Sequence, residues 1–141
     1  MAFRIFKIDF QGYWRESKIS NIPSKSGVYC AYECTHNEDK KIVSIHKLIY
    51  VGESADVRQR IASHEKWDDW KKYVRPGNVL CFNFAYVVSP DRDRVEAALI
   101  YKHKPPENVE YLYDFPFDDT ELENTGQTAL LFTKFILKRR D

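Results

Sequence analysis

The sequence predicts an α/β (α+β) fold in which a small central three-stranded sheet, mixed or antiparallel, is flanked by helices. Three short runs are rich in aromatic and β-branched residues, which is typical of strands. Two further segments carry apolar residues at helical spacing. With 141 residues, 43% of them hydrophobic and 15% aromatic, the chain is predicted to form a single domain over residues 1–141 with enough apolar surface for a core. The expected order is strand, strand, helix, strand, helix.

The first two strands are predicted as a hairpin. Residues 1–26 form a polar and aromatic lead-in that ends in the turn-rich NIPSKSG. The run GVYCAYEC (27–34) is read as one strand and IVSIHKLIYVG (42–52) as the next. The polar THNEDKK between them predicts an antiparallel hairpin with a long tip.

A helix is expected after the hairpin. Ser54 is the predicted N-cap, and Asp56 in the first turn complements the helix dipole. Val57 and Ile61 are four residues apart, so they share the buried face. The helix is expected to continue to about Trp70.

A third strand and a second helix follow. The turn at residues 76–78 (PGN) precedes the apolar run VLCFNFAYVV (79–88), which predicts a strand. Pro90 suits the first position of a helix, and Pro105 ends it. Beyond it, residues 111–119 are expected to form a loop. Residues 128–137 are compatible with a helix or a late strand, and their aromatic residues favour the strand.

Charge and hydropathy limit the classes of protein. The 22 basic and 21 acidic residues give a net charge of +1, which argues against a surface coated in positive charge but leaves room for a local phosphate-binding face. No apolar run approaches the ~18 residues of a membrane span. The N-terminus has no secretory apolar region. We therefore expect a cytoplasmic protein without a membrane partner.

Three cysteines, Cys30, Cys34 and Cys81, are expected to be structural. Cys30 and Cys34 fall in one predicted strand, where residues four apart lie about 13 Å from each other at about 3.3 Å per residue. That distance is too long for a disulfide or for shared ligation of one zinc ion. An odd number of cysteines also suits a reducing compartment.

Polar side chains occur at particular points of these otherwise apolar elements. Each taken alone has an ordinary explanation: strand packing for the tyrosines, a solvated helix face for Arg60 and His64, and an ion pair with Arg92 or Lys102 for Glu96. Arg60 and His64 are four residues apart and are expected on one helix face. In chain order the set is Tyr29, Tyr50, Arg60, His64, Glu96 and Asn108.

This ordered set resembles the GIY-YIG nuclease domain, with GVY and YVG in place of the two motifs that name it. The resemblance runs from about Gly27 to Asn108. It implies a β-β-α-β-α core over about residues 24–110 and a C-terminal extension over about residues 111–141. It also implies a metal-dependent endonuclease, a phosphodiester hydrolase that acts on DNA with one divalent cation, Mg²⁺ or Mn²⁺.

The resemblance assigns roles to the matching residues. Arg60 is implied to contact the scissile phosphate and Glu96 to bind the metal ion, while Tyr29, Tyr50 and His64 line the active site. Substrate binding is implied for Gly52, Arg60 and Asn108. No protein partner is indicated.

Physical chemistry suits these roles. The guanidinium of Arg60 is a fixed cation whose donors fit phosphate oxygens. Glu96 offers one hard oxygen ligand, and Mg²⁺ is commonly held by one carboxylate together with waters and substrate phosphate. A tyrosine hydroxyl has a pKa near 10 and needs a nearby cation to act as a base. Tyr29, Tyr50 and His64 all stay candidates for the general base.

Two features depart from the family pattern. The interval from Tyr29 to Tyr50 is roughly twice the usual one, so an extended hairpin tip is expected. Glu53 stands where many relatives carry lysine, and its carboxylate is expected to repel a substrate phosphate. The alternative function is therefore a catalytically inactive nucleic-acid-binding or protein-interaction module that keeps the fold.

Overall fold

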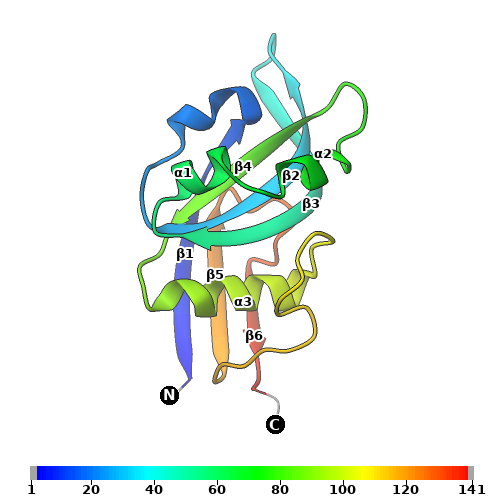
Figure 1. The fold of residues 1–141 in the computed structure, drawn as a ribbon. Helices are drawn as coiled ribbons and strands as arrows, with labels where there is room; N and C mark the ends of the chain where they lie inside the picture. Colours follow the sequence, from blue (N-terminus) through cyan, green and yellow to red (C-terminus); the bar gives the residue numbers. More distant parts are fainter. Residues whose placement is uncertain (1–2, 140–141) are drawn as a thin grey trace.

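The computed structural model describes residues 3–139, so residues 1–2 and 140–141 of the predicted domain lie outside the described part of the chain. The fold is a mixed α+β arrangement with one curled sheet (Figure 1). The expected α+β class is confirmed, but the prediction of three strands is wrong, because the sheet has six strands in the order β3-β2-β4-β1-β5-β6. The elements are β1 (Arg4–Arg15), η1 (Glu16–Asn21), β2 (Gly27–Asn37), β3 (Ile42–Ser54), α1 (Val57–Ala62), α2 (Trp67–Lys71), β4 (Val79–Tyr86), α3 (Asp91–His103), β5 (Thr120–Gly126) and β6 (Lys134–Leu137).

The predicted hairpin is present and forms one end of the sheet, but the expected long tip is wrong, because the paired strands extend to Asn37 and from Ile42 and leave only residues 38–41 as the tip. Strands β2 and β3 pair antiparallel, and β4 pairs antiparallel with the other side of β2. Tyr29 therefore lies opposite Gly52, and Ala31 lies opposite Tyr50. Because β3 is the last strand on this side, one edge of its backbone faces away from the sheet.

Two unexpected strands, β1 and β5, lie toward the two ends of the sequence. The lead-in contains β1, in which Phe6, Ile8 and Phe10 are buried while the residues between them are exposed. This period of two is a strand signal, and the interspersed Lys7 and Asp9 concealed it. Strand β5 (TELENTG) has few residues typical of strands, and it forms by parallel pairing with β1, far away in the sequence.

The late strand is shorter than expected. Only residues 134–137 are extended, as β6, whereas residues 128–133 form a turn and irregular backbone. Residues 111–119 are irregular, as predicted. The segment after residue 111 therefore adds β5 and β6 to the same sheet as the hairpin.

The single helix expected from Ser54 to about Trp70 is instead two short helices. The N-cap is Asp56, whose carboxylate accepts a hydrogen bond from the backbone N–H of Gln59. Helix α1 ends before Ser63, whose hydroxyl donates to the Gln59 carbonyl. The ring Nδ1 of His64 then accepts from the backbone N–H of Lys66. These side-chain bonds to the backbone compete with helix continuation, and the chain turns between α1 and α2.

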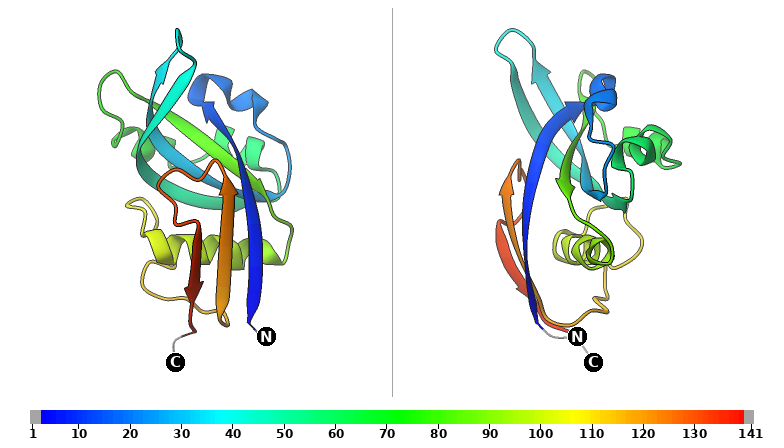
Figure 2. Two further views of the ribbon diagram at one scale, coloured as in Figure 1. Left: turned by 180° about the vertical axis from the view of Figure 1, so that it is seen from behind. Right: turned by 90° about the vertical axis from the view of Figure 1, so that its left-hand side faces the viewer.

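The bent sheet carries apolar clusters on both faces. Trp70 anchors one cluster, which packs α1 and α2 against Tyr29, Phe82 and Phe84. Helix α3 begins after Pro90, ends before Pro105 as predicted, and lies in the angle between the two parts of the sheet (Figure 2). Its buried residues pack against β1, β2 and β5, so α3 is held between the hairpin and the C-terminal strands.

The cysteines are all buried and free of disulfides, on β2 and β4. Within residues 3–139, no helix is long and apolar enough to cross a membrane.

Candidate active site at the edge of strand β3

The predicted site residues gather where the edge of β3 runs between the α1–α2 segment and α3 (Figure 1). Tyr29 is buried, with 1% of its surface exposed, while Tyr50 is half-buried. Their ring centroids are 6.3 Å apart. The hairpin thus brings together two tyrosines that are 21 positions apart in the sequence.

Gly52 leaves the space that the Tyr29 hydroxyl occupies. A Cβ added to Gly52 would stand 2.4 Å from the hydroxyl oxygen of Tyr29, closer than any real contact. An alanine here would therefore displace the Tyr29 side chain. Gly27, the glycine of the GVY motif, is equally constrained, because a Cβ added there would stand 2.2 Å from the Ala85 carbonyl oxygen.

Asn108 closes the outer edge of β3 beside Tyr50. Its side-chain oxygen accepts from the backbone N–H of Val51, and its side-chain N–H donates to the Val51 carbonyl, each at 2.9 Å. The backbone N–H of Glu107 donates to the Ile49 carbonyl in the same way. Unpaired buried backbone groups are costly, so this amide fixes the position of the Tyr50-Val51-Gly52 segment.

A cavity of about 220 Å³ lies beside Tyr50 and contains the carboxylate predicted to bind metal. Glu96 projects into it from α3, and in the described residues no cation forms an ion pair with Glu96. Burial, followed by the charges of Glu53, Asp93 and Glu110, raises the pKa of Glu96 to about 8. The lining consists of Tyr50, Lys66, Glu96, Ile100, Asn108, Val109 and Glu110.

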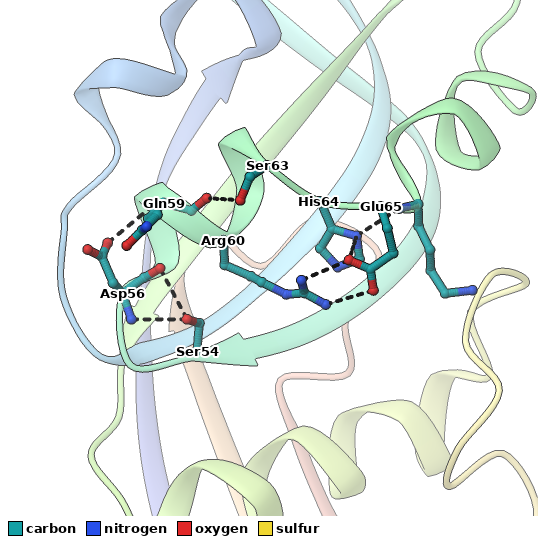
Figure 3. A network of polar contacts seen from close by, with 8 residues as sticks. Ser54, Asp56, Gln59, Arg60, Ser63, His64 and Glu65 are labelled. Carbon is teal, nitrogen blue, oxygen red and sulfur yellow. Dashed lines mark hydrogen bonds and ion pairs between the residues drawn. The ribbon is translucent and has the colours of Figure 1, made fainter.

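Arg60 stands at the end of α1 and is already engaged by a carboxylate. Its two terminal nitrogens donate to Glu65 at 2.8 and 3.0 Å, in a two-pronged ion pair (Figure 3). The charge of Arg60 still lowers the pKa of Tyr29 and Tyr50, against burial, which is the larger effect on both. For Tyr29 the result is a pKa well above the usual value, and for Tyr50 a pKa of about 12.

His64 lies beyond the end of α1 rather than on a common helix face with Arg60. Its ring packs between Tyr50 and Trp70, with centroid distances of 5.3 and 4.4 Å. Burial, aided by the charge of Arg60, lowers the pKa of His64 to about 4. The ring is therefore neutral at pH 7, and its Nδ1 lone pair receives the backbone N–H of Lys66.

Glu53 forms an ion pair with Arg92, which the sequence did not predict. Arg92 of α3 donates to the Glu53 carboxylate at 3.2 Å and to the Ser26 hydroxyl at 2.8 Å. Arg92 is one helical turn before Glu96, so the same helix supplies the cation for Glu53 and the carboxylate of the cavity. The repulsion expected between Glu53 and a phosphate is offset by this pair.

Sequence reasoning missed four residues of the site: Glu65, Lys66, Arg92 and Glu110. Glu65 and Lys66 directly follow His64, but the prediction of a continuous helix hid the turn that brings them to the cavity. Arg92 was considered only as a partner of Glu96. Glu110 lies two residues after Asn108 in the irregular segment that follows α3, and nothing in its local pattern distinguishes it from a solvated loop residue.

The donor set is compatible with one hard cation. Within residues 3–139, no group of three or more His, Cys, Asp or Glu side chains forms a cage for a metal ion. Glu96 nevertheless offers a half-buried carboxylate without an ion-pair partner, close to the charges of Glu53 and Glu110. A divalent cation would relieve that unfavourable charge, and Mg²⁺ needs only one or two carboxylates beside water and phosphate.

Comparison with known proteins gives one family match. A family model described as the GIY-YIG catalytic domain matches residues 26–109, well over half of the chain. No match was found among curated proteins or among solved structures. The matched segment runs from the start of β2 to the residue after Asn108, and so contains all the residues predicted for the site.

Proposed function

Because this chain belongs to the GIY-YIG family of nuclease domains, we propose that it is an endonuclease that hydrolyses DNA phosphodiester bonds with a divalent cation, Mg²⁺ or Mn²⁺. The family consists of nucleases, generally metal-dependent and acting on DNA. The reaction adds water to phosphorus and breaks the bond to one ester oxygen. The protein has to bind the phosphate, take a proton from the water and offset the charge that develops.

Glu96 holds the metal ion in this proposal. Its carboxylate is the one that α3 projects into the cavity beside Tyr50. When bound, a divalent cation polarises the phosphoryl oxygen and stabilises the charge on the leaving oxygen. The raised pKa of Glu96, about 8, means that metal binding competes with a proton at neutral pH.

In this proposal Arg60 binds the scissile phosphate, which takes the place of the Glu65 carboxylate. The fork that now donates to Glu65 presents two parallel N–H groups, which is also the geometry that phosphate oxygens accept. The pair is largely exposed, with 37% of the Arg60 and 66% of the Glu65 side-chain surface accessible. Exposed ion pairs contribute little free energy, so a phosphate can replace Glu65 at small cost.

Tyr50 is the proposed proton acceptor, and Tyr29 and His64 are assigned to positioning. Tyr50 lines the cavity, whereas Tyr29 is 1% exposed and His64 is packed between two aromatic rings. Tyr50 has to be a phenolate to accept the proton of the water. The charge of Arg60 lowers the pKa of Tyr50 and so favours the phenolate. Neutralisation of Glu96 removes one of the charges that raise it. Asn108 and Gly52 position the strand that carries Tyr50.

The observation that carries the proposal is the shared cavity of Tyr50 and Glu96 next to the charge of Arg60, inside the matched segment. Perturbed pKa values and an uncompensated carboxylate in one cleft are typical of catalytic sites. The inactive module stays the alternative. One feature that favours it is the expected repulsion between the Glu53 carboxylate and a phosphate, and Arg92 pairs with that carboxylate.

Cleavage of supercoiled plasmid tests the proposal directly. The parent protein with Mg²⁺ or Mn²⁺ should give nicked and linear DNA, and EDTA should stop the reaction. Glu96→Gln keeps the shape of the side chain but loses the charge, and it should cleave at least about a hundredfold more slowly.

The matched control is Glu38→Gln at the hairpin tip, an exposed carboxylate that pairs with Arg15. It should cleave like the parent. Absence of cleavage by the parent with either cation, together with measurable DNA binding, would establish the inactive-module alternative. Undiminished cleavage by Glu96→Gln would remove Glu96 from the metal site.

A further inference from the structure

Three cations surround the proposed site, and they differ in what they contact. Arg60 donates to Glu65, and Arg92 donates to Glu53. Among the residues that the structure describes, no carboxylate lies within ion-pair distance of the Lys66 ammonium group. Lys66 also lines the cavity that contains Glu96, Tyr50 and Asn108, which neither arginine does.

The charges around this cavity are one-sided without Lys66. Glu96 and Glu110 both line it, and Glu53 and Asp93 lie near enough for their charges to raise the pKa of Glu96. A phosphodiester that enters the cavity brings a further negative charge. Glu53 is paired with Arg92, and a cation bound at Glu96 would neutralise that carboxylate, so Glu110 is the charge in the lining that an approaching phosphate still meets. Lys66 is the cation in the lining that opposes it.

The backbone around Lys66 is held in place by the site itself. Its N–H donates to Nδ1 of His64 at 3.1 Å, and its carbonyl accepts from the Trp70 N–H at 2.9 Å in the first turn of α2. His64 and Trp70 are both buried and pack against each other. The side chain of Lys66 thus starts from a fixed point of the cavity wall.

We propose that Lys66 is a catalytic residue of this nuclease, contacting the phosphate beside Glu96 and stabilising the charge that develops there during hydrolysis, with His64 as the residue that positions it. The proposal rests on the proposed endonuclease function. In this proposal the two cations have distinct roles: Arg60 binds the phosphate from the α1 side, and Lys66 contacts it from the cavity side.

The experiment compares Lys66→Ala and Lys66→Arg with Lys72→Ala. Lys72 is the C-cap residue of α2, has a 75% exposed side chain that pairs with Asp69, and is absent from the cavity lining. Single-turnover cleavage gives the rate of the chemical step. DNA affinity is measured separately in EDTA, in the Glu96→Gln background, so that binding is read without metal or turnover.

Lys66→Ala should lower the single-turnover rate on the order of tenfold to a hundredfold, while DNA affinity changes by less than about threefold. The salt dependence of binding should fall by about one phosphate contact. Lys66→Arg should recover most of the rate because it retains a cation on a long side chain, and Lys72→Ala should match the parent. The melting temperature should stay unchanged in all three variants.

Two results would overturn the role of Lys66 while leaving the endonuclease function intact. One is a parent protein that cleaves and a Lys66→Ala variant that cleaves equally fast. The other is a loss of affinity as large as the loss of rate, which would make Lys66 a docking residue. Failure of the parent itself to cleave would instead overturn the proposed function, and the role of Lys66 in catalysis with it.

Discussion

Two charged residues of α3, Arg94 and Glu96, are two positions apart and meet opposite conditions. Arg94 faces β5 and is 3% exposed. Its guanidinium donates to the Thr120 hydroxyl at 2.9 Å and to the Asp119 carbonyl at 3.0 Å. Glu96 faces the cavity at β3, without a cation paired to it in the described residues, and burial raises its pKa to about 8.

The difference separates stability from function along one helix. Where α3 meets β5, the buried guanidinium of Arg94 is hydrogen-bonded, as is usual for polar groups that stabilise a fold. Where α3 meets β3, an acid is held in a place that opposes its ionisation, which costs stability and leaves it ready for a cation.

The largest expected effect is on stability, at the β5 side. Arg94→Met keeps the apolar stem but leaves the Thr120 hydroxyl and the carbonyls of Asp118 and Asp119 without this donor. The free energy of unfolding should fall by about 3 kcal/mol, measured by urea denaturation. Arg4→Met is the control, because its pair with Asp91 is exposed and should change stability by less than about 0.5 kcal/mol. Equal losses in the two variants would contradict the support role of Arg94.

The next effect, at the β3 side, is a lower cleavage rate with unchanged stability. Arg60→Ala should slow cleavage about a hundredfold, equivalent to about 2.7 kcal/mol of transition-state stabilisation, and leave the melting temperature within about 1 °C. DNA affinity should fall less than tenfold. Arg60→Lys should rescue poorly because an ammonium cannot reproduce the two-pronged contact that Glu65 now makes. Parallel losses of rate and affinity would identify Arg60 as a docking residue only.

The third effect is a gain of stability from the loss of a site residue. The pKa of Glu96 is raised from 4.5 to about 8 in the folded protein, so the folded state binds a proton more tightly than the unfolded state. Stability of the parent should therefore fall as pH rises from about 4.5 to 8. Glu96→Gln does not titrate there, so at pH 8 it should be more stable than the parent and melt at a higher temperature. The difference should shrink as the pH falls toward 5.

Added Mg²⁺ sharpens this last measurement, because it reads metal binding without turnover. At pH 8 the ion should raise the melting temperature of the parent and leave that of Glu96→Gln unchanged. A parent protein that is as stable as Glu96→Gln at pH 8 would show that folding does not raise the pKa of Glu96. A shift by Mg²⁺ in both proteins would place the ion elsewhere.

The chain's local patterns were sufficient for the hairpin, for β4 and for α3. The β2 and β3 runs are aromatic and β-branched, and α3 is bounded by Pro90 and Pro105, so short-range chemistry defines them. The same patterns named the tyrosines and Glu96, since their order along the chain is specific even where each alone is not. Local patterns failed at β1, where charged residues alternate with the buried ones, and at the turn between α1 and α2, where side chains of Ser63 and His64 bind the backbone.

The sequence by itself predicted the hairpin, β4 and α3, and it proposed Tyr29, Tyr50, Arg60 and Glu96 as site residues, because these predictions depend on residue types at fixed spacing. Only the tertiary structure decided that β1, β5 and β6 complete the sheet and that Arg92 pairs with Glu53. It also decided that Lys66 reaches the cavity of Glu96 while Arg60 meets Glu65. The physical reason is that strand pairing and charge compensation join residues distant along the chain, and neither leaves a mark in the local pattern of any one segment.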